Sequence, residues 1–154
     1  GDAGYLKDSH LYLTERIKDL FKTSNGKYIS PQALETKLAI DRYIDQIAVI
    51  ADERKFVSAL IVPVYGFVKD YAEEKGIAYN NMDELLQHSK IQALFRARID
   101  TLQQQFAHYE QVKRFTLLTE PFSMERGELT NTLKLKRSVV AKNYKGLIDK
   151  MYEE

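Results

Sequence analysis

The side chains best suited to chemistry lie in residues 127–137, which read Gly-Glu-Leu-Thr-Asn-Thr-Leu-Lys-Leu-Lys-Arg. Attack of a carboxylate on the α-phosphate of ATP brings two anions together, so a fixed cation at the reacting oxygens stabilises the transition state. Lys134 is suited to this role, because Thr130, Asn131 and Thr132 favour a loop that presents one side chain to a partner surface. The alternative is a set of solvated charges near the start of a helix.

A second candidate pair lies near the N-terminus. Asp2 can accept hydrogen bonds from two ribose hydroxyls, and Arg16 is a planar multiple donor that can reach ribose or phosphate oxygens. Both suit a bound nucleotide. The alternative is a turn aspartate and an exposed strand arginine that form a surface pair.

The first half of the chain predicts short strands followed by one helix and a buried hairpin. Residues 5–29 alternate short apolar segments with turn residues. Ser30 and Pro31 predict an N-cap and a first helical position, so we expect a helix over residues 31–39. Two apolar runs at 47–50 and 56–62, separated by charges and ended by Pro63, predict a buried hairpin.

The second half predicts mainly helices. Helical patterns cover 64–75, which ends at Gly76, then 82–88, and then a longer stripe from Ile91 to Phe106. A strand is expected at 115–118, and helical spacing returns from about Lys136. Strands and helices do not alternate strictly, which predicts an α+β class: a small central β-sheet with an antiparallel hairpin, packed by helices in a single compact domain.

Composition excludes several classes of protein. The chain has 154 residues, a net charge of +1 and no cysteine, which fits one globular domain without disulfides or thiolate metal sites. No apolar run approaches the roughly 20 residues that span a bilayer. The start at Gly1, without methionine, suggests an internal piece of a longer polypeptide. The lack of cysteine is compatible with a reducing cytoplasm.

Other signals do not reach the strength of a site. The histidines 10, 88 and 108 are far apart and lack companions at ligand spacing, so no metal site is expected. Ser24-Asn25-Gly26-Lys27 lacks the spacing of a phosphate-binding P-loop. The basic C-terminal stretch is diluted by acidic residues at 149, 153 and 154, so no nucleic-acid partner is expected.

Three segments together resemble the adenylate-forming synthetases. Gly-Asp-Ala-Gly at 1–4 is similar to their Gly-Asp-x-Gly motif, residues 15–31 resemble their hinge motif, and 127–137 is similar to the lysine loop of the long-chain fatty-acid branch. The segments occur in the family's order and cover essentially the whole chain. Leu133 stands where many members have glycine and Asn131 where proline is frequent, which bears on loop shape more than on chemistry.

The resemblance implies a role for each candidate residue. It makes Lys134 the adenylation lysine, assigns Asp2 and Arg16 to the nucleotide, and places the interdomain hinge at Lys18. It also sets a short segment against the active site during thioester formation, where glycine permits close approach of a narrow ligand. The residues of that segment are Lys22, Ser24, Asn25 and Gly26; an ordinary hairpin turn explains Asn25-Gly26 equally well.

The resemblance further implies the mobile C-terminal domain, residues 1–154, of an AMP-forming long-chain fatty-acid CoA ligase whose large N-terminal domain is absent here. ATP, Mg²⁺, fatty acid and CoA belong to the complete enzyme, which is expected in the cytoplasm, with peripheral membrane association left open. One alternative is another adenylating enzyme, such as an acyl or aryl carrier-protein ligase. A second is a non-catalytic binding module.

Overall fold

The structure is a computed structural model that describes residues 20–52 and 54–153. A three-stranded sheet with the order β3-β4-β5 forms its centre, and a separate hairpin joins β1 and β2. β3 and β4 pair antiparallel, whereas β4 and β5 pair parallel. The strands are β1 (Phe21–Lys22), β2 (Tyr28–Ile29), β3 (Ile44–Ile50), β4 (Val57–Pro63) and β5 (Val112–Leu117). The predicted α+β class with an antiparallel hairpin is confirmed.

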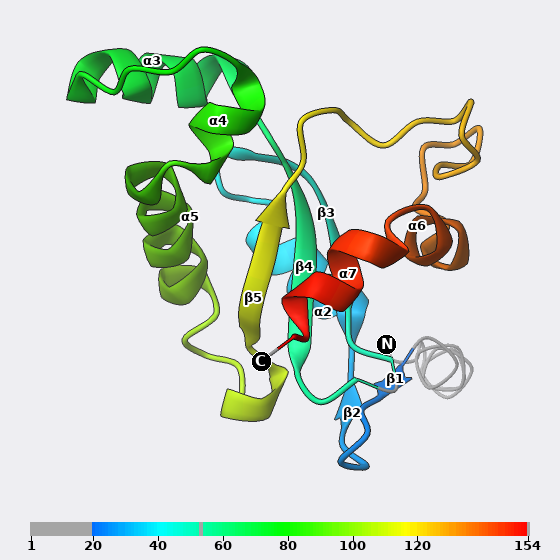
Figure 1. Cartoon of the computed structure of the whole chain (residues 1–154). Coiled ribbons are helices and arrows are strands. Elements are labelled where there is room, and N and C mark those ends of the chain that lie inside the picture. Colours follow the sequence, from blue (N-terminus) through cyan, green and yellow to red (C-terminus); the bar gives the residue numbers. More distant parts are fainter. Residues whose placement is uncertain (1–19, 53, 154) are drawn as a thin grey trace, which may run out of the picture.

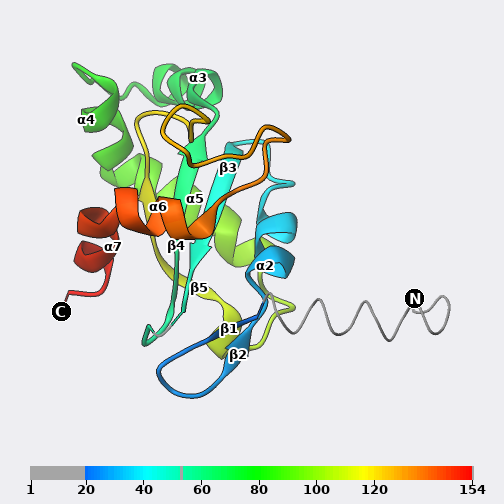
Figure 2. The ribbon, with the colours of Figure 1, turned by 90° about the vertical axis from the view of Figure 1, so that its right-hand side faces the viewer.

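Helices cover both faces of the sheet (Figures 1 and 2). The helices are α2 (Pro31–Leu38), α3 (Tyr65–Lys75), α4 (Met82–Gln87), α5 (Ser89–Leu102), α6 (Arg137–Asn143) and α7 (Lys145–Met151), with a 3-10 turn at His108–Glu110. Side chains of β4 alternate between the two layers: Ala59 and Ile61 pack with α2 and α5, and Leu60 and Val62 pack with α6 and α7. Every residue of β4 is buried, so the strand anchors both cores.

Local signals located most helix ends correctly. The Ser30 hydroxyl accepts a hydrogen bond from the Ala33 amide and Pro31 opens α2, as predicted. Gly76 ends α3 in the left-handed conformation at φ +68°. The C-terminal helix, in contrast, is divided at Tyr144, which leaves helical geometry and packs edge-on against Phe122 with ring centroids 5.9 Å apart.

Two strands are longer than predicted. β3 begins at Ile44 rather than Ile47, and β5 begins at Val112 rather than Phe115. In β5 the exposed charges of Lys113 and Arg114 interrupt the apolar pattern, because β5 lies at the edge of the sheet, where charged side chains are tolerated.

The buried side-chain amide of Gln103 pairs with the backbone of Val112, the first residue of β5, as a neighbouring strand would. Its Oε1 accepts from the Val112 amide at 2.7 Å, and its Nε2 donates to the Val112 carbonyl at 3.1 Å. Helix α5 therefore ends before Phe106, where the apolar stripe had predicted its continuation.

Replacing Gln103 with methionine should expose the cost of this contact. A side chain of similar length leaves the buried Val112 N–H without an acceptor, so the free energy of unfolding should fall by about 1–3 kcal/mol. Urea denaturation measures the change. Gln104→Met, at the exposed neighbouring position, is the control and should change it by less than about 0.5 kcal/mol.

Candidate functional site

Lys134 lies at the end of a tight hairpin loop. The loop is closed by an isolated antiparallel bridge between Leu129 and Leu135. Within it, the Thr130 amide donates to the Lys134 carbonyl and the Leu133 amide donates to the Thr130 carbonyl, both at 2.8 Å. The Thr130 hydroxyl accepts from the Lys134 amide at 3.0 Å. The backbone of Lys134 is therefore fixed, while its exposed ammonium group has no hydrogen-bond or ion-pair partner among the described residues.

The turn between β1 and β2 has the same construction. The Thr23 amide donates to the Lys27 carbonyl and the Gly26 amide donates to the Thr23 carbonyl, both at 2.9 Å. The Thr23 hydroxyl accepts from the Lys27 amide at 3.3 Å. Both turns thus run from a threonine to a lysine, with three hydrogen bonds in corresponding positions.

The residue before each lysine is left-handed. Gly26 has φ +81° and Leu133 has φ +64°, and Leu133 is the one non-glycine residue with positive φ in the described part of the chain. Three-residue hairpin loops place a left-handed residue at this position, usually glycine. Leu133, which stands where many members of the resembled family have glycine, therefore occupies a position where glycine would be least strained.

A buried carboxylate holds the base of the Lys134 loop. Glu128 is 1% exposed at its side chain. Its carboxylate accepts from Arg126 Nη2 at 2.9 Å, from Asn143 Nδ2 at 3.0 Å and from the Ser123 amide at 3.0 Å. Its backbone carbonyl accepts from the Lys136 amide at 2.8 Å, on the other side of the loop. Glu128 thereby joins the loop to helix α6 and to the segment that precedes it.

The same contacts keep Glu128 charged. Burial raises the pKa of the Glu128 carboxyl, but the hydrogen bonds from Arg126, Asn143 and the Ser123 amide outweigh burial and hold that pKa below its ordinary value. The carboxylate is consequently ionised at neutral pH and keeps its hydrogen bonds from Arg126, Asn143 and the Ser123 amide.

The Arg137 side chain is engaged in contacts within the domain. Both of its Nη atoms donate to the Glu35 carboxylate on α2, and its guanidinium lies over the Phe21 ring at 5.6 Å. Glu35 also accepts from the Val49 amide at the outer edge of β3, at 2.8 Å. Of the three cations that end the 127–137 segment, Lys134 and Lys136 therefore remain exposed.

The other predicted residues lie in two places. Lys22 is exposed, with its ammonium 5.8 Å from the Tyr28 ring. Ser24 and Asn25 are held to the β3–β4 turn, since the Ser24 amide donates to the Arg54 carbonyl at 3.0 Å and the Asn25 side chain donates to a carbonyl of that turn at 3.4 Å. The β1–β2 turn lies well apart from the Lys134 loop (Figures 1 and 2). Asp2, Arg16 and Lys18 lie outside the described residues.

Sequence reasoning missed Glu128 and Glu35. Nothing in the local pattern shows that a glutamate two residues after Arg126 is buried, and the partner of Glu35 is 102 positions away. The one available signal was that Glu128 falls within the segment already singled out at 127–137.

A cavity of about 380 Å³ lies between the β1–β2 hairpin and the C-terminal helices. Phe21, Val49 and Ile148 give it apolar walls, and Arg137 and Ser138 lie at its margin. It can accept an apolar group close to the ion pair of Arg137.

Residues 20–52 and 54–153 contain neither a membrane-spanning helix nor a cluster of metal-binding side chains. None of the described helices is long and apolar enough to cross a bilayer. These residues also contain no cluster of three or more histidine, aspartate or glutamate side chains that could hold a metal ion.

The sequence matches known proteins along its whole length. The profile of the family described as AMP-binding enzyme C-terminal domain matches residues 18–154. The chain is 33% identical to long chain acyl-CoA synthetase 7, peroxisomal, of Arabidopsis thaliana, over 100% of this chain and 23% of that protein. It is 33% identical to long-chain-fatty-acid–CoA ligase 5 of Rattus norvegicus, over 99% of this chain and 23% of that protein. The chain thus spans about a quarter of the length of these relatives.

Solved structures share the fold. The adenylation domain of a carboxylate reductase from Mycobacterium chelonae superposes with a TM-score of 0.72 at 23% identity, covering 90% of this chain and 20% of that one. A fatty acyl CoA synthetase from Mycobacterium tuberculosis superposes with a TM-score of 0.53 at 15% identity, covering 86% and 21%. At these identities the likeness establishes the fold alone.

Substitutions at the two left-handed positions should shift the free energy of unfolding in opposite directions. Leu133→Gly should raise the free energy of unfolding by about 0.5–1 kcal/mol, because relief of the left-handed strain exceeds the added chain entropy. Gly26→Ala should lower it by about 1 kcal/mol, although nothing lies within 4 Å of the added Cβ. Urea denaturation measures both. Leu133→Ala, which keeps a Cβ, is the control and should give no gain; a gain equal to that of glycine would contradict the strain.

Removing the charge of Glu128 should cost stability at neutral pH and much less in acid. Glu128→Gln should lower the free energy of unfolding at pH 7 by about 2 kcal/mol, because charge-assisted hydrogen bonds are lost. The folded pKa lies below the unfolded value of about 4.3, so the advantage of glutamate is complete above that value and disappears as pH falls through the folded pKa. Urea denaturation at pH 7 and pH 3 tests this. Glu125→Gln, at an exposed position of the same segment, is the control.

Proposed function

The chain belongs to the AMP-binding enzyme C-terminal domain family, and from that premise we propose that residues 1–154 form the mobile C-terminal domain of an AMP-forming long-chain fatty-acid CoA ligase. The complete enzyme would use fatty acid, MgATP and CoA as substrates. The large N-terminal domain would supply the acyl and nucleotide pockets. The observation that carries the proposal is the placement of Lys134: an exposed cation on a loop whose backbone is held by three hydrogen bonds.

In the first half-reaction, a carboxylate oxygen of the fatty acid attacks the α-phosphorus of ATP and pyrophosphate leaves. Negative charge accumulates on the oxygens at that phosphorus, and the ammonium group of Lys134 is proposed to stabilise it. The Glu128 contacts support this role, because a loop fixed at its base presents the lysine without reorganisation. Asp2 and Arg16 are proposed to hold the ribose and phosphates of the same nucleotide.

In the second half-reaction, the CoA thiolate attacks the acyl carbonyl carbon and AMP leaves. We propose that the domain rotates about Lys18 between the two steps and brings forward the turn with Lys22, Ser24, Asn25 and Gly26. The separation of this turn from the Lys134 loop supports two orientations, because one orientation cannot present both to a single site (Figure 1). The absence of a side chain at Gly26 leaves room for a narrow thiol arm.

A specific loss of the first half-reaction tests the role of Lys134. In the full-length ligase, Lys134→Ala should reduce acyl-adenylate formation by about 10²- to 10³-fold, the scale for one preorganised electrostatic group. Thioester formation from supplied acyl-adenylate should remain nearly normal. Pyrophosphate release and CoA-dependent consumption of acyl-adenylate are followed separately. Lys136→Ala, at an exposed lysine of the same segment, is the matched control and should affect neither step strongly.

The hinge variant Lys18→Pro in the same assay should show the reverse pattern, because a locked φ restricts the rotation while leaving the first orientation accessible. Equal losses in both half-reactions for Lys134→Ala and Lys18→Pro would indicate general destabilisation and remove the proposed division of roles.

Replacing CoA with a phosphopantetheinylated carrier protein in the second assay tests the alternative of a carrier-protein ligase.

A further inference from the structure

The outer edge of β5 is open. In the part of the chain that the structure describes, β5 pairs only with β4. The Leu118 amide donates to the Ile61 carbonyl of β4 at 2.8 Å, and backbone groups alternate sides along a strand, so those of Phe115 and Leu117 point away from β4. Arg96 Nη1 caps the preceding outward carbonyl, that of Lys113, at 2.9 Å. The unpaired edge therefore begins at Phe115.

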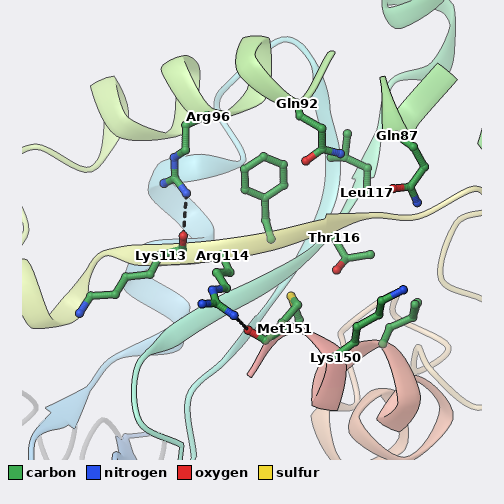
Figure 3. A pocket seen from close by; sticks show the side chains of 11 residues that line it. Gln87, Gln92, Arg96, Lys113, Arg114, Thr116, Leu117, Lys150 and Met151 are labelled. Carbon is green, nitrogen blue, oxygen red and sulfur yellow. Dashed lines mark hydrogen bonds between the residues drawn. The ribbon is translucent and has the colours of Figure 1, made fainter. Parts of the chain in front are cut away.

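This edge is the floor of a groove (Figure 3). Gln92 and Arg96 of α5 form one wall, and Leu147, Lys150 and Met151 of α7 form the other. The groove has a volume of about 380 Å³. Residues 113–117 of the strand line it one after another, an arrangement that suits an extended peptide segment.

The side chains that line the groove carry an excess of positive charge. Among the described residues that line it are two lysines and two arginines but no aspartate or glutamate. Asp100 neutralises Arg96. Arg114 donates to the carbonyls of Met151 and Glu153, both at 2.7 Å, and no carboxylate of the described residues pairs with it.

Three polar side chains in the groove have no partner among the described residues. Within residues 20–52 and 54–153, the side chains of Lys113, Lys150 and Thr116 have no hydrogen-bond or ion-pair partner. Thr116 and Lys150 lie on the α7 side of the strand in Figure 3. Successive side chains of an added strand would point alternately toward α5 and toward α7, where Lys150 lies.

We propose that this groove, residues 113–117 with its two walls, binds an extended acidic segment of another protein by adding it as a fourth strand to the sheet. Outward backbone groups of Phe115 and Leu117 would supply the main-chain hydrogen bonds, and Lys113, Arg114 and Lys150 would select carboxylates. The proposal concerns a surface separate from the Lys134 loop and does not depend on the proposed ligase activity.

The charge pattern argues against two other occupants. A second copy of β5 would place its lysine and arginine against the same cations, and such repulsion is how edge strands avoid self-pairing. A small anion such as pyrophosphate can pair with the lysines but leaves the backbone groups of the edge unpaired. The extended acidic segment satisfies both features.

Peptide titration of the isotopically labelled 154-residue chain tests the proposal. The probe is a capped hexapeptide that alternates glutamate and valine; the comparison probes are its lysine counterpart, an alternately N-methylated version and inorganic pyrophosphate. The acidic peptide should shift the amide resonances of Phe115 and Leu117 and slow their hydrogen exchange. The lysine and N-methylated peptides should bind at least about tenfold more weakly. Equal binding of the N-methylated peptide, or binding of pyrophosphate alone, would overturn strand addition.

A charge exchange provides the matched variants. Lys113→Glu with Lys150→Glu should weaken binding of the acidic peptide by about tenfold and strengthen that of the lysine peptide, because both side chains are exposed. Lys69→Glu with Lys142→Glu makes the same change of charge outside the groove and should leave both affinities unchanged. Identical effects of the two double variants, or a concentration-dependent dimer without peptide, would contradict the proposal. Ligase activity plays no part in these measurements.

Discussion

The ionised carboxylate of Glu128 holds together the segment that carries Lys134. Burying a charge is unfavourable unless hydrogen bonds and an opposite charge compensate for lost water, and Arg126, Asn143 and the Ser123 amide provide both. Because these donors come from before the loop and from α6, the loop cannot change shape without breaking several contacts at once. The exposed side chain of Lys134 therefore starts from a hydrogen-bonded backbone, which suits the electrostatic role proposed for it.

The two threonine-to-lysine turns show one backbone solution used twice. In each, the threonine hydroxyl accepts from the lysine amide and the preceding residue is left-handed. Glycine takes this conformation without strain at position 26, whereas leucine occupies it at position 133. The turn near β1 is free to approach another backbone closely, because Gly26 has no side chain. The Lys134 loop instead carries an exposed leucine beside its lysine, which adds an apolar contact surface at the tip.

Local signals predicted the helices and the β3–β4 hairpin because each depends on residues close in sequence. Ser30 with Pro31 starts a helix, Gly76 ends one, and Pro63 closes a strand. The parallel pairing of β5 with β4 was not predictable in this way, since it depends on how three intervening helices cross the sheet. The burial of Glu128 and the Glu35–Arg137 pair depend on tertiary contacts as well. The role of Lys134 is a prediction from the family resemblance, and the structure adds the hydrogen bonds that hold the backbone of its loop.

The two edges of the sheet differ in how far side chains bond to their outward backbone groups. On β3, the outward Val49 amide is bonded by Glu35, and the same carboxylate binds Arg137, so this edge is tied to the segment that carries Lys134. On β5, Gln103 and Arg96 satisfy the first two residues, but no comparable side chain reaches Phe115 or Leu117 in the described part of the chain. One edge of the sheet is thus occupied by side chains of the same chain, whereas the described part of the other edge is available for pairing. The cations along β5 prevent that free edge from pairing with its own kind, while they leave it open to an acidic strand.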